Sequence, residues 1–164
     1  MIRCSNCSVG SLRKGKTKDH NVGPLFGLEE VLLDRAPALV CGSCGHVALE
    51  GDVIEAARTE LAKFLVRERT VLNPREVRFL RETIGMTQAQ LAERLDIIRG
   101  TVTRWEAGDD DLGPIQSFAV RTLAAWSLDG EKLAHQVSAP DSPKPAVAAA
   151  RPYRIPGDSL RGAA

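Results

Sequence analysis

Residues 87–108, TQAQLAERLDIIRGTVTRWEAG, decide how the second half of this 164-residue chain folds. Thr87 is a good N-cap, and Gln90 three residues later can complete a capping box. Leu91 and Ala92 then fall on one face, and Ala92 is small enough for a second helix to cross closely above it. The stretch is therefore expected to begin with a short amphipathic helix.

A tight turn and a second helix are expected to follow. Asp96 can carry the turn, because aspartate tolerates a left-handed backbone better than most residues. Helical spacing resumes at Val102 and Trp105, and Gly108 supplies a stop because it adopts the left-handed cap conformation without a side-chain penalty. Two short helices joined in this way are typical of a helix-turn-helix, whose second helix enters the major groove of DNA.

The residues expected to touch DNA are those left outside when Val102 and Trp105 face inward. Arginine can donate two parallel hydrogen bonds to guanine, and glycine allows a close approach to the groove. Hydroxyl and amide groups at a helix start can bind phosphate, helped by the helix dipole. The candidate DNA-binding residues are Thr87, Gln88, Arg99, Gly100, Thr101, Thr103 and Arg104.

The charge of this region argues for a dimer. Residues 73–130 carry seven arginines, no lysine and nine acidic residues, a net charge of −2. A monomer would bind DNA poorly, so we expect a homodimer with recognition helices about 34 to 36 Å apart on a palindrome. The acidic residues 109–111 should then point away from the phosphates. For Arg104, a surface salt bridge with Glu106 or Asp96 is the alternative to base reading.

Four cysteines form the second strong pattern, as Cys4-x-x-Cys7 and Cys41-x-x-Cys44. Each pair can present two thiolates from a tight turn, and together they can hold one tetrahedral zinc. The 33 residues between the pairs exceed the roughly 15 to 20 of a compact zinc ribbon. A small sheet is expected to fill this gap.

Alternating lysines predict one strand of that sheet, at residues 14–18, and LEEVLLDRAPALV at residues 28–40 predicts a returning strand. The turn between them is expected at Asn21, Gly23 and Pro24. The basic residues 13–18 can contact DNA or an acidic protein, or form a solvated face.

Other interpretations of the cysteines remain open. Disulfides would suit a secreted protein, but the start MIRCSNC lacks the apolar core of a secretion signal. A redox pair needs a CxxC at a strand-to-helix junction in a βαβ unit. A catalytic zinc keeps an open position, whereas four cysteines close the shell, and His46 is expected at the surface or beside the ligands. We therefore expect one structural zinc per chain and no enzymatic activity.

Two further helices are expected between the cysteines and the helix-turn-helix. Residues 52–72 form a connecting helix, packed on its own domains or, alternatively, presented to a partner. Asn73 then caps a helix that Pro74 begins and Gly85 ends. The apolar stripes of the two helices are Ile54, Ala57, Leu61 and Phe64 in the first and Val77, Leu80 and Ile84 in the second.

Helical spacing and composition describe the rest of the chain. At least one helix should follow residue 113, with its apolar residues at Ile115, Phe118, Val120, Leu123 and Trp126. From Ser138 on, the chain is rich in Pro, Ala, Ser and Gly, so disorder is expected, with a short docking segment at residues 153–155 as the alternative.

The composition is 43% hydrophobic and 26% charged, with a net charge of +1. DNA binding must therefore rest on local patches. No apolar run approaches the roughly 18 to 20 residues that span a bilayer, so we expect no membrane contact and a cytoplasmic location, associated with the nucleoid when DNA is bound.

The predicted fold class is α+β with two domains. A zinc-bound β-module occupies residues 1–51 and the connecting helix residues 52–72. An all-α helix-turn-helix domain follows at residues 73–137, and a disordered tail at residues 138–164.

The two cysteine pairs and the run TQAQLAERL…TVTRWEAG, in this order, resemble the MqsA antitoxins over roughly residues 1–130. These proteins join a YgiT-type zinc finger to an Xre-type, lambda-repressor-like helix-turn-helix. The resemblance implies an antitoxin of a type II toxin–antitoxin system. Its zinc module would neutralise a cognate toxin, often an mRNA-cleaving enzyme, and its helical domain would dimerise on a palindromic operator and repress its own operon. A stand-alone zinc-containing transcriptional regulator without a toxin is the alternative.

Two positions depart from the family pattern. An Asn and, four residues later, an Arg read the operator in that pattern; Arg104 matches the Arg, but Gly100 stands in the place of the Asn. Arg99 is expected to take over part of that role. Ile98 occupies the turn position where Xre-type proteins often have Ser or another capping residue. The resemblance therefore implies a sequence preference that differs from the family's.

Overall fold

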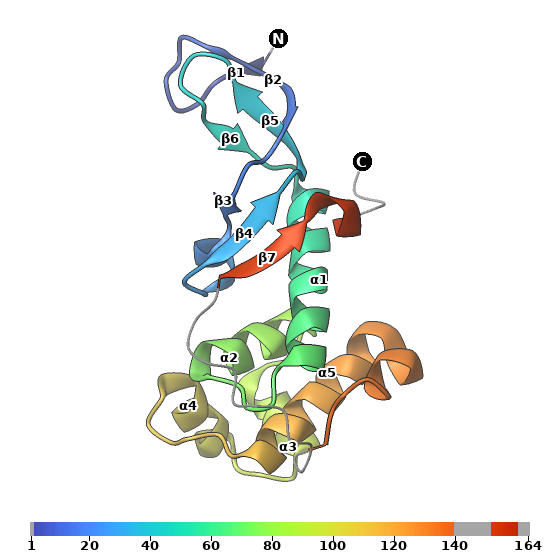
Figure 1. Cartoon of the computed structure of the whole chain (residues 1–164). Helices are drawn as coiled ribbons and strands as arrows, with labels where there is room; N and C mark the ends of the chain where they lie inside the picture. The colour runs from blue at the N-terminus through green and yellow to red at the C-terminus, as the bar shows by residue number, and fades with distance from the viewer. Residues whose placement is uncertain (1, 140–151, 161–164) are drawn as a thin grey trace. The chain divides into compact units, whose positions relative to one another are not determined.

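The computed structural model describes residues 2–139 and 152–160, which form two compact units (Figure 1). The sheet unit comprises residues 2–60 and 152–160, and the helical unit comprises residues 61–139. Strands in one unit and helices in the other confirm the α+β fold class. Within the described ranges, no helix has both the length and the apolar character that crossing a membrane requires.

The first sheet of the sheet unit has four strands in the order β1-β2-β5-β6, with antiparallel neighbours. β2 overlaps the predicted lysine strand at residues 14–16 but begins and ends earlier. Its pairing with β5 runs from Leu12 opposite Cys41 to Lys16 opposite Pro37, so β2 starts where β5 ends. This register brings both cysteine pairs to the same end of the sheet. The strands are β1 Ile2–Arg3, β2 Ser11–Lys16, β5 Pro37–Cys41 and β6 Val47–Ala48.

A second sheet has the order β3-β4-β7. β3 and β4 are antiparallel and are joined through a 3-10 helix, η1, whereas β7 pairs with β4 in parallel. The single returning strand predicted at residues 28–40 is therefore wrong. Arg35 has a left-handed backbone with φ of 58°, which ends β4 and lets β5 join the other sheet. The elements are β3 His20–Asn21, η1 Gly23–Phe26, β4 Val31–Asp34 and β7 Tyr153–Pro156.

β7 and the following 3-10 helix η2 (Gly157–Leu160) correct the expectation of disorder for residues 152–160. Ile155 and Leu160 are only 5% and 4% exposed, and their burial offsets the entropy of ordering a segment that is polar on average. The docking-segment alternative describes these residues better. The rest of the predicted tail, residues 140–151 and 161–164, lies outside the described residues.

In the described part of the chain, five helices follow the first six strands, and the backbone of the last helix is non-helical at Asp129 and Gly130. In α1, a spacing of four residues places Val53, Ala57, Leu61 and Leu65 at fully buried positions. The predicted stripe was correct for Ala57 and Leu61 but wrong for Phe64, which is 40% exposed. The helices are α1 Gly51–Glu68, α2 Pro74–Thr83, α3 Gln88–Arg94, α4 Arg99–Ala107 and α5 Pro114–Ala134.

Local signals define α2. The Asn73 side chain accepts from the Glu76 amide at 2.9 Å, and the Glu76 carboxylate accepts from the Asn73 amide at 2.8 Å. Pro74 occupies the first turn, where no amide donor is needed. Val77 and Leu80 are fully buried, as predicted.

Polar residues occupy part of the buried face of α5. Val120 is buried as predicted, but Ile115 and Trp126 are 71% and 56% exposed. Ser117 and Arg121 are fully buried instead, because they pair with backbone groups near the end of α1, in the segment between α1 and α2, and after α5. Ser117 accepts from the Leu72 amide at 3.1 Å, and Arg121 donates to the carbonyls of Val66 and Ser138 at 3.2 and 3.0 Å.

Candidate nucleic-acid interface and metal site

The helix-turn-helix is formed by α3, a turn and α4. Thr87 and Gln90 make the predicted capping box: Gln90 N donates to Thr87 Oγ1 at 3.2 Å and Thr87 N donates to Gln90 Oε1 at 2.8 Å. Asp96 carries the left-handed turn with φ of 54°, and Gly108 ends α4 with φ of 81°. These local predictions are confirmed.

α4 buries one side and exposes the other. Val102 is fully buried and Trp105 nearly so, as their spacing predicts. The candidate DNA-binding residues of α4 are therefore accessible: Thr101 is half-buried, and Arg99, Gly100, Thr103 and Arg104 are exposed.

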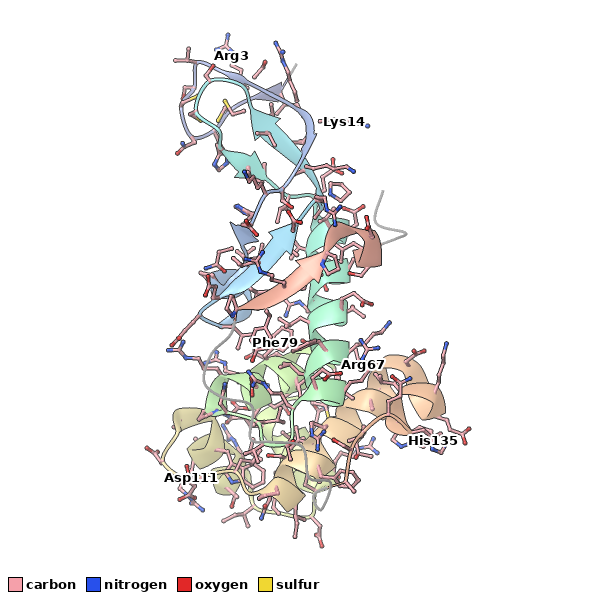
Figure 2. The ribbon with its side chains drawn as sticks, viewed as in Figure 1. Arg3, Lys14, Arg67, Phe79, Asp111 and His135 are labelled. Atoms are coloured by element: carbon pink, nitrogen blue, oxygen red, sulfur yellow. The ribbon has the colours of Figure 1, made fainter. Side chains whose placement is uncertain are left out.

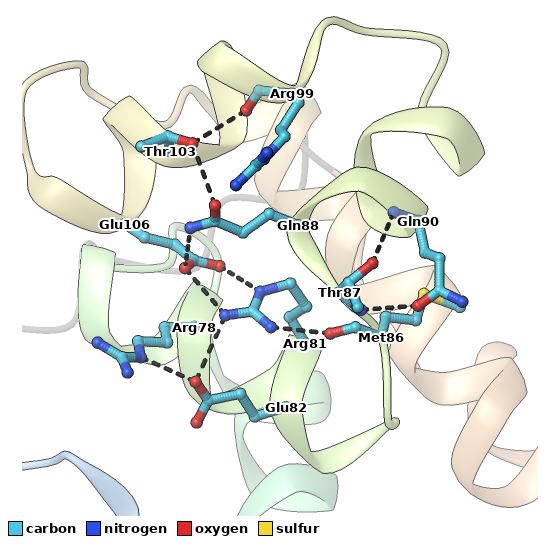
Figure 3. A network of polar contacts seen from close by, with 10 residues as sticks. All are labelled: Arg78, Arg81, Glu82, Met86, Thr87, Gln88, Gln90, Arg99, Thr103 and Glu106. Atoms are coloured by element: carbon cyan, nitrogen blue, oxygen red, sulfur yellow. Dashed lines mark hydrogen bonds and ion pairs between the residues drawn. The ribbon is translucent and has the colours of Figure 1, made fainter.

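Hydrogen bonds join α3 to α4 through Gln88 (Figure 3). Gln88 Nε2 donates to Glu106 Oε2 at 2.9 Å, and Thr103 Oγ1 donates to Gln88 Oε1 at 3.1 Å. Thr103 Oγ1 also lies 3.3 Å from the carbonyl oxygen of Arg99. Gln88 and Thr103, two candidate phosphate ligands, are thus neighbours held at a fixed spacing.

A buried ion pair, which the sequence analysis did not identify, supports this interface from beneath. Arg81 in α2 donates through Nε and Nη2 to Glu106, and through Nη1 to the Met86 carbonyl at 2.8 Å. The hydrogen bond to Glu106 raises the pKa of Arg81 above its ordinary value. No local spacing signals a pair 25 residues apart, so only the packing of α2 against α4 reveals it.

Arg104 has an acidic partner of its own. Its guanidinium makes an ion pair with Asp110, and Nη2 lies 3.4 Å from Thr101 Oγ1. The alternative of a surface salt bridge therefore holds with a different partner, because Glu106 is taken up by Arg81. Asp110 belongs to the acidic loop at residues 109–111 and contacts a candidate base-reading residue, whereas the position of this loop relative to DNA phosphates stays a prediction.

The four cysteines come together at the end of the first sheet. Their sulfur atoms all lie within 4.8 Å of one another, with 3.7 Å between Cys4 and Cys44 and 3.8 Å between Cys7 and Cys41. Four sulfurs about 2.3 Å from a tetrahedral zinc would be separated by about 3.8 Å. The cluster does not include His46. The donor set and its spacing therefore suit a metal ion.

Backbone amides prepare two of these thiols for a metal. The amide of Gly10 lowers the pKa of Cys7 to about 6, and the amide of Cys44 lowers the pKa of Cys41. The amide of Cys7 also acts to lower the pKa of Cys4, but burial and hydrogen bonds among the sulfurs raise it to about 11. Metal binding would therefore release the Cys4 proton.

The same sheet presents cations to solvent. Arg3 and Lys14 extend outward from β1 and β2 (Figure 2), and Arg13, Lys16 and Lys18 are exposed as well. These basic residues lie on β2, just after it, and on the neighbouring strand β1.

Comparison with known proteins supports the prediction of a helix-turn-helix. A family model described as Helix-turn-helix matches residues 77–115, from α2 to the start of α5. No curated protein matches the sequence. Helix-turn-helix domains bind DNA and are typical of regulators. The chain thus carries a helix-turn-helix, a kind of DNA-binding domain found in transcription regulators, together with a four-cysteine cluster able to bind a metal ion.

Proposed function

We propose that this protein is the antitoxin of a type II toxin–antitoxin system. It binds a palindromic operator in the cytoplasm as a homodimer, represses its own operon, and neutralises a toxin through the sheet unit. The observation that carries the proposal is a four-cysteine cluster followed in one chain by a helix-turn-helix, the combination that resembles the MqsA antitoxins.

The exposed side of α4 supplies the base contacts. Arg99 and Arg104 are the base readers, and Thr87, Gln88, Thr101 and Thr103 bind phosphates. A Cβ added at Gly100 would meet only Arg104 Nη1, at 3.8 Å, so packing within the free protein does not require a glycine there. Its missing side chain serves the approach of α4 to the groove.

The homodimer is supported by apolar surface on α5. Ile115 and Trp126 are large and exposed, and Ala119 and Thr122 between them follow helical spacing along the same face. A second copy that packs on this face would remove it from water.

The metal is a structural zinc, one per chain. Cys4 and Cys7 precede β2, and Cys41 and Cys44 lie at the turn between β5 and β6, so one ion would fasten these two turns together. Four thiolates leave no open position for substrate, which supports a role in folding and not in catalysis.

Replacing Arg99 and Arg104 by alanine tests the DNA interface. Wild-type protein should bind a palindrome upstream of its own gene with steep salt dependence, and each bidentate arginine contributes about 1 to 3 kcal/mol of base discrimination. The double variant should lose specific binding, whereas Arg94→Ala, which removes an exposed cation from α3, should keep it. Unchanged operator affinity in the double variant would overturn the assignment.

Coexpression with the products of neighbouring genes tests the antitoxin role. One product should arrest growth alone, and this protein should relieve the arrest, whereas Cys41→Ser should not. If no neighbouring product is toxic or copurifies with the chain, the protein is a stand-alone zinc-containing regulator.

A further inference from the structure

The edge of β4 is covered by a segment distant in sequence. β4 is buried along Val31, Leu32 and Leu33, and β3 pairs with it over only two residues. β7 covers the opposite edge over four residues, and Tyr153 N donates to the Glu30 carbonyl at 3.3 Å beyond the strand. Residues 152–160 therefore satisfy most of the hydrogen-bonding capacity of that edge.

Side chains fix the register of this segment. Ile155 and Leu160 are buried anchors, and Arg154 makes an ion pair with Asp19. Gly157 lies so close to the backbone of Arg35 that any Cβ would overlap its carbonyl group. Four features of the segment thus fit the sheet unit. They are the cation of Arg154, the apolar side chains of Ile155 and Leu160, and the missing side chain of Gly157.

This arrangement has the elements of peptide recognition by strand addition. In that mode, main-chain hydrogen bonds supply affinity, and pockets for particular side chains supply specificity. The difference is that the ligand here belongs to the same chain. Twelve residues, 140–151, tether it to the helical unit, and they can span at most about 40 Å.

We propose that the β4 edge, with Asp19 and the backbone at Arg35, is a peptide-binding site whose ligand is residues 152–160 of a second copy of the chain as well as its own. Exchange between copies reproduces every contact of the bound segment, so it costs no interaction energy. Within a homodimer, a tethered segment acts at an effective concentration on the order of 1 mM wherever its tether reaches the site, so exchange requires that residues 140–151 span the distance to the partner copy's β4 edge. This exchange rests on the proposed homodimer, whereas recognition of the peptide does not.

A fluorescent peptide with the sequence of residues 151–164 tests the site on the full chain. Gly157→Val should expel the chain's own segment, because the added side chain overlaps the Arg35 backbone. The peptide should then bind this variant and raise its melting temperature. Its binding to wild-type protein should be weaker by about tenfold or more, because the tethered segment competes at about 1 mM.

Matched variants test the recognition pattern. A peptide carrying Gly157→Val should bind neither chain. Adding Asp19→Arg to the Gly157→Val chain should weaken binding of the wild-type peptide, because two cations then face each other. A peptide carrying Arg154→Glu should bind this double variant with recovered affinity. DNA binding plays no part in these measurements, so their failure is separate from failure of the proposed function.

Three results would overturn the proposal. They are no binding to the Gly157→Val chain, equal binding of wild-type and Gly157→Val peptides, and equal binding to wild-type and variant chains. If Gly157→Val impairs folding, Arg154→Glu in the full chain loosens the segment through charge alone. The wild-type peptide must then raise the melting temperature of that variant, and no rise would equally reject the site.

Discussion

The sheet unit and the helical unit are stabilised by different means. In the helical unit, each helix packs apolar residues such as Leu80, Leu91 and Val102 into a core, and a buried ion pair joins α2 to α4. The sheet unit also buries apolar residues such as Val31 and Leu33, but its strands have only two to six residues, with the cysteine cluster at one end of the first sheet and β7 at the edge of β4. Loss of one ligand or one distant segment should therefore harm the sheet unit far more than the helical unit.

Removing the proposed zinc should distinguish the stability of the sheet unit from that of the helical unit most clearly. A structural zinc supplies about 10 to 16 kcal/mol in small zinc domains, comparable to or above the 5 to 15 kcal/mol that stabilises a typical protein. Cys41→Ser or a chelator should therefore abolish hydrogen-exchange protection in β2 and β5, while α2 to α5 keep theirs. Ser5→Ala, an exposed change between two of the cysteines, is the control. Simultaneous loss of protection in both units would contradict the comparison.

Breaking the buried ion pair should affect the helical unit next most strongly. Glu106→Ala leaves buried Arg81 with the longer ion pair to Glu82, at 3.4 Å, so the cost should approach the roughly 3 to 5 kcal/mol of breaking a buried ion pair. Chemical unfolding followed by the fluorescence of Trp105 and Trp126, both in the helical unit, measures the loss. The double variant Arg81→Met with Glu106→Leu should recover most of it, because apolar residues replace both charges. A single variant as stable as wild type would show that the pair contributes little.

A missing cap offers a smaller gain. Ile98 is the N-cap of α4, but its apolar side chain cannot accept a cap hydrogen bond. It is 70% exposed, so a smaller polar residue can replace it without loss of buried contacts. Ile98→Ser should stabilise the helical unit by about 1 kcal/mol, because a hydroxyl can accept from an unpaired amide of the first turn. Thermal melting compares it with Ile98→Ala, which should show no such gain. Equal melting temperatures for the two variants would argue against capping.

The exposed pair of Arg104 and Asp110 should matter least for stability. Surface ion pairs contribute about 0 to 1 kcal/mol, so Asp110→Asn should barely change the melting temperature. It should strengthen operator binding in the proposed function, because Arg104 then reaches DNA without first breaking an ion pair with a carboxylate. Asp111→Asn removes the same charge from the same loop without touching Arg104 and should strengthen binding less. Equal effects of the two variants would indicate a general charge effect.

The same contrast explains how much the sequence could predict. Caps at Asn73 and Thr87, the left-handed Asp96 and the stop at Gly108 join residues at most three or four positions apart, so each was readable from a short window. The cysteine pairs were equally readable, because a two-residue gap carries its own meaning.

Long-range pairings were beyond such windows. No sequence pattern near Tyr153 predicts that β7 pairs with β4, and none near Arg81 predicts its ion pair with Glu106. The buried polar residues Ser117 and Arg121 also broke the apolar pattern of α5, because they pair with the backbone of other elements. The sequence therefore predicted which residues α4 exposes and missed the buried groups that hold them, and DNA binding by the exposed residues stays a prediction.

β4 and β7 pair in the sheet but are far apart in the chain, so β4 is synthesised well before its partner. At about 5 to 20 residues per second, residues 35–152 take roughly 6 to 24 seconds to synthesise. Throughout that interval β4 has one bare edge, while all five helices are completed before β7 emerges. A nascent chain is therefore able to fold its DNA-binding part first, and its sheet unit remains open to proteases and to foreign strands until the last strand arrives.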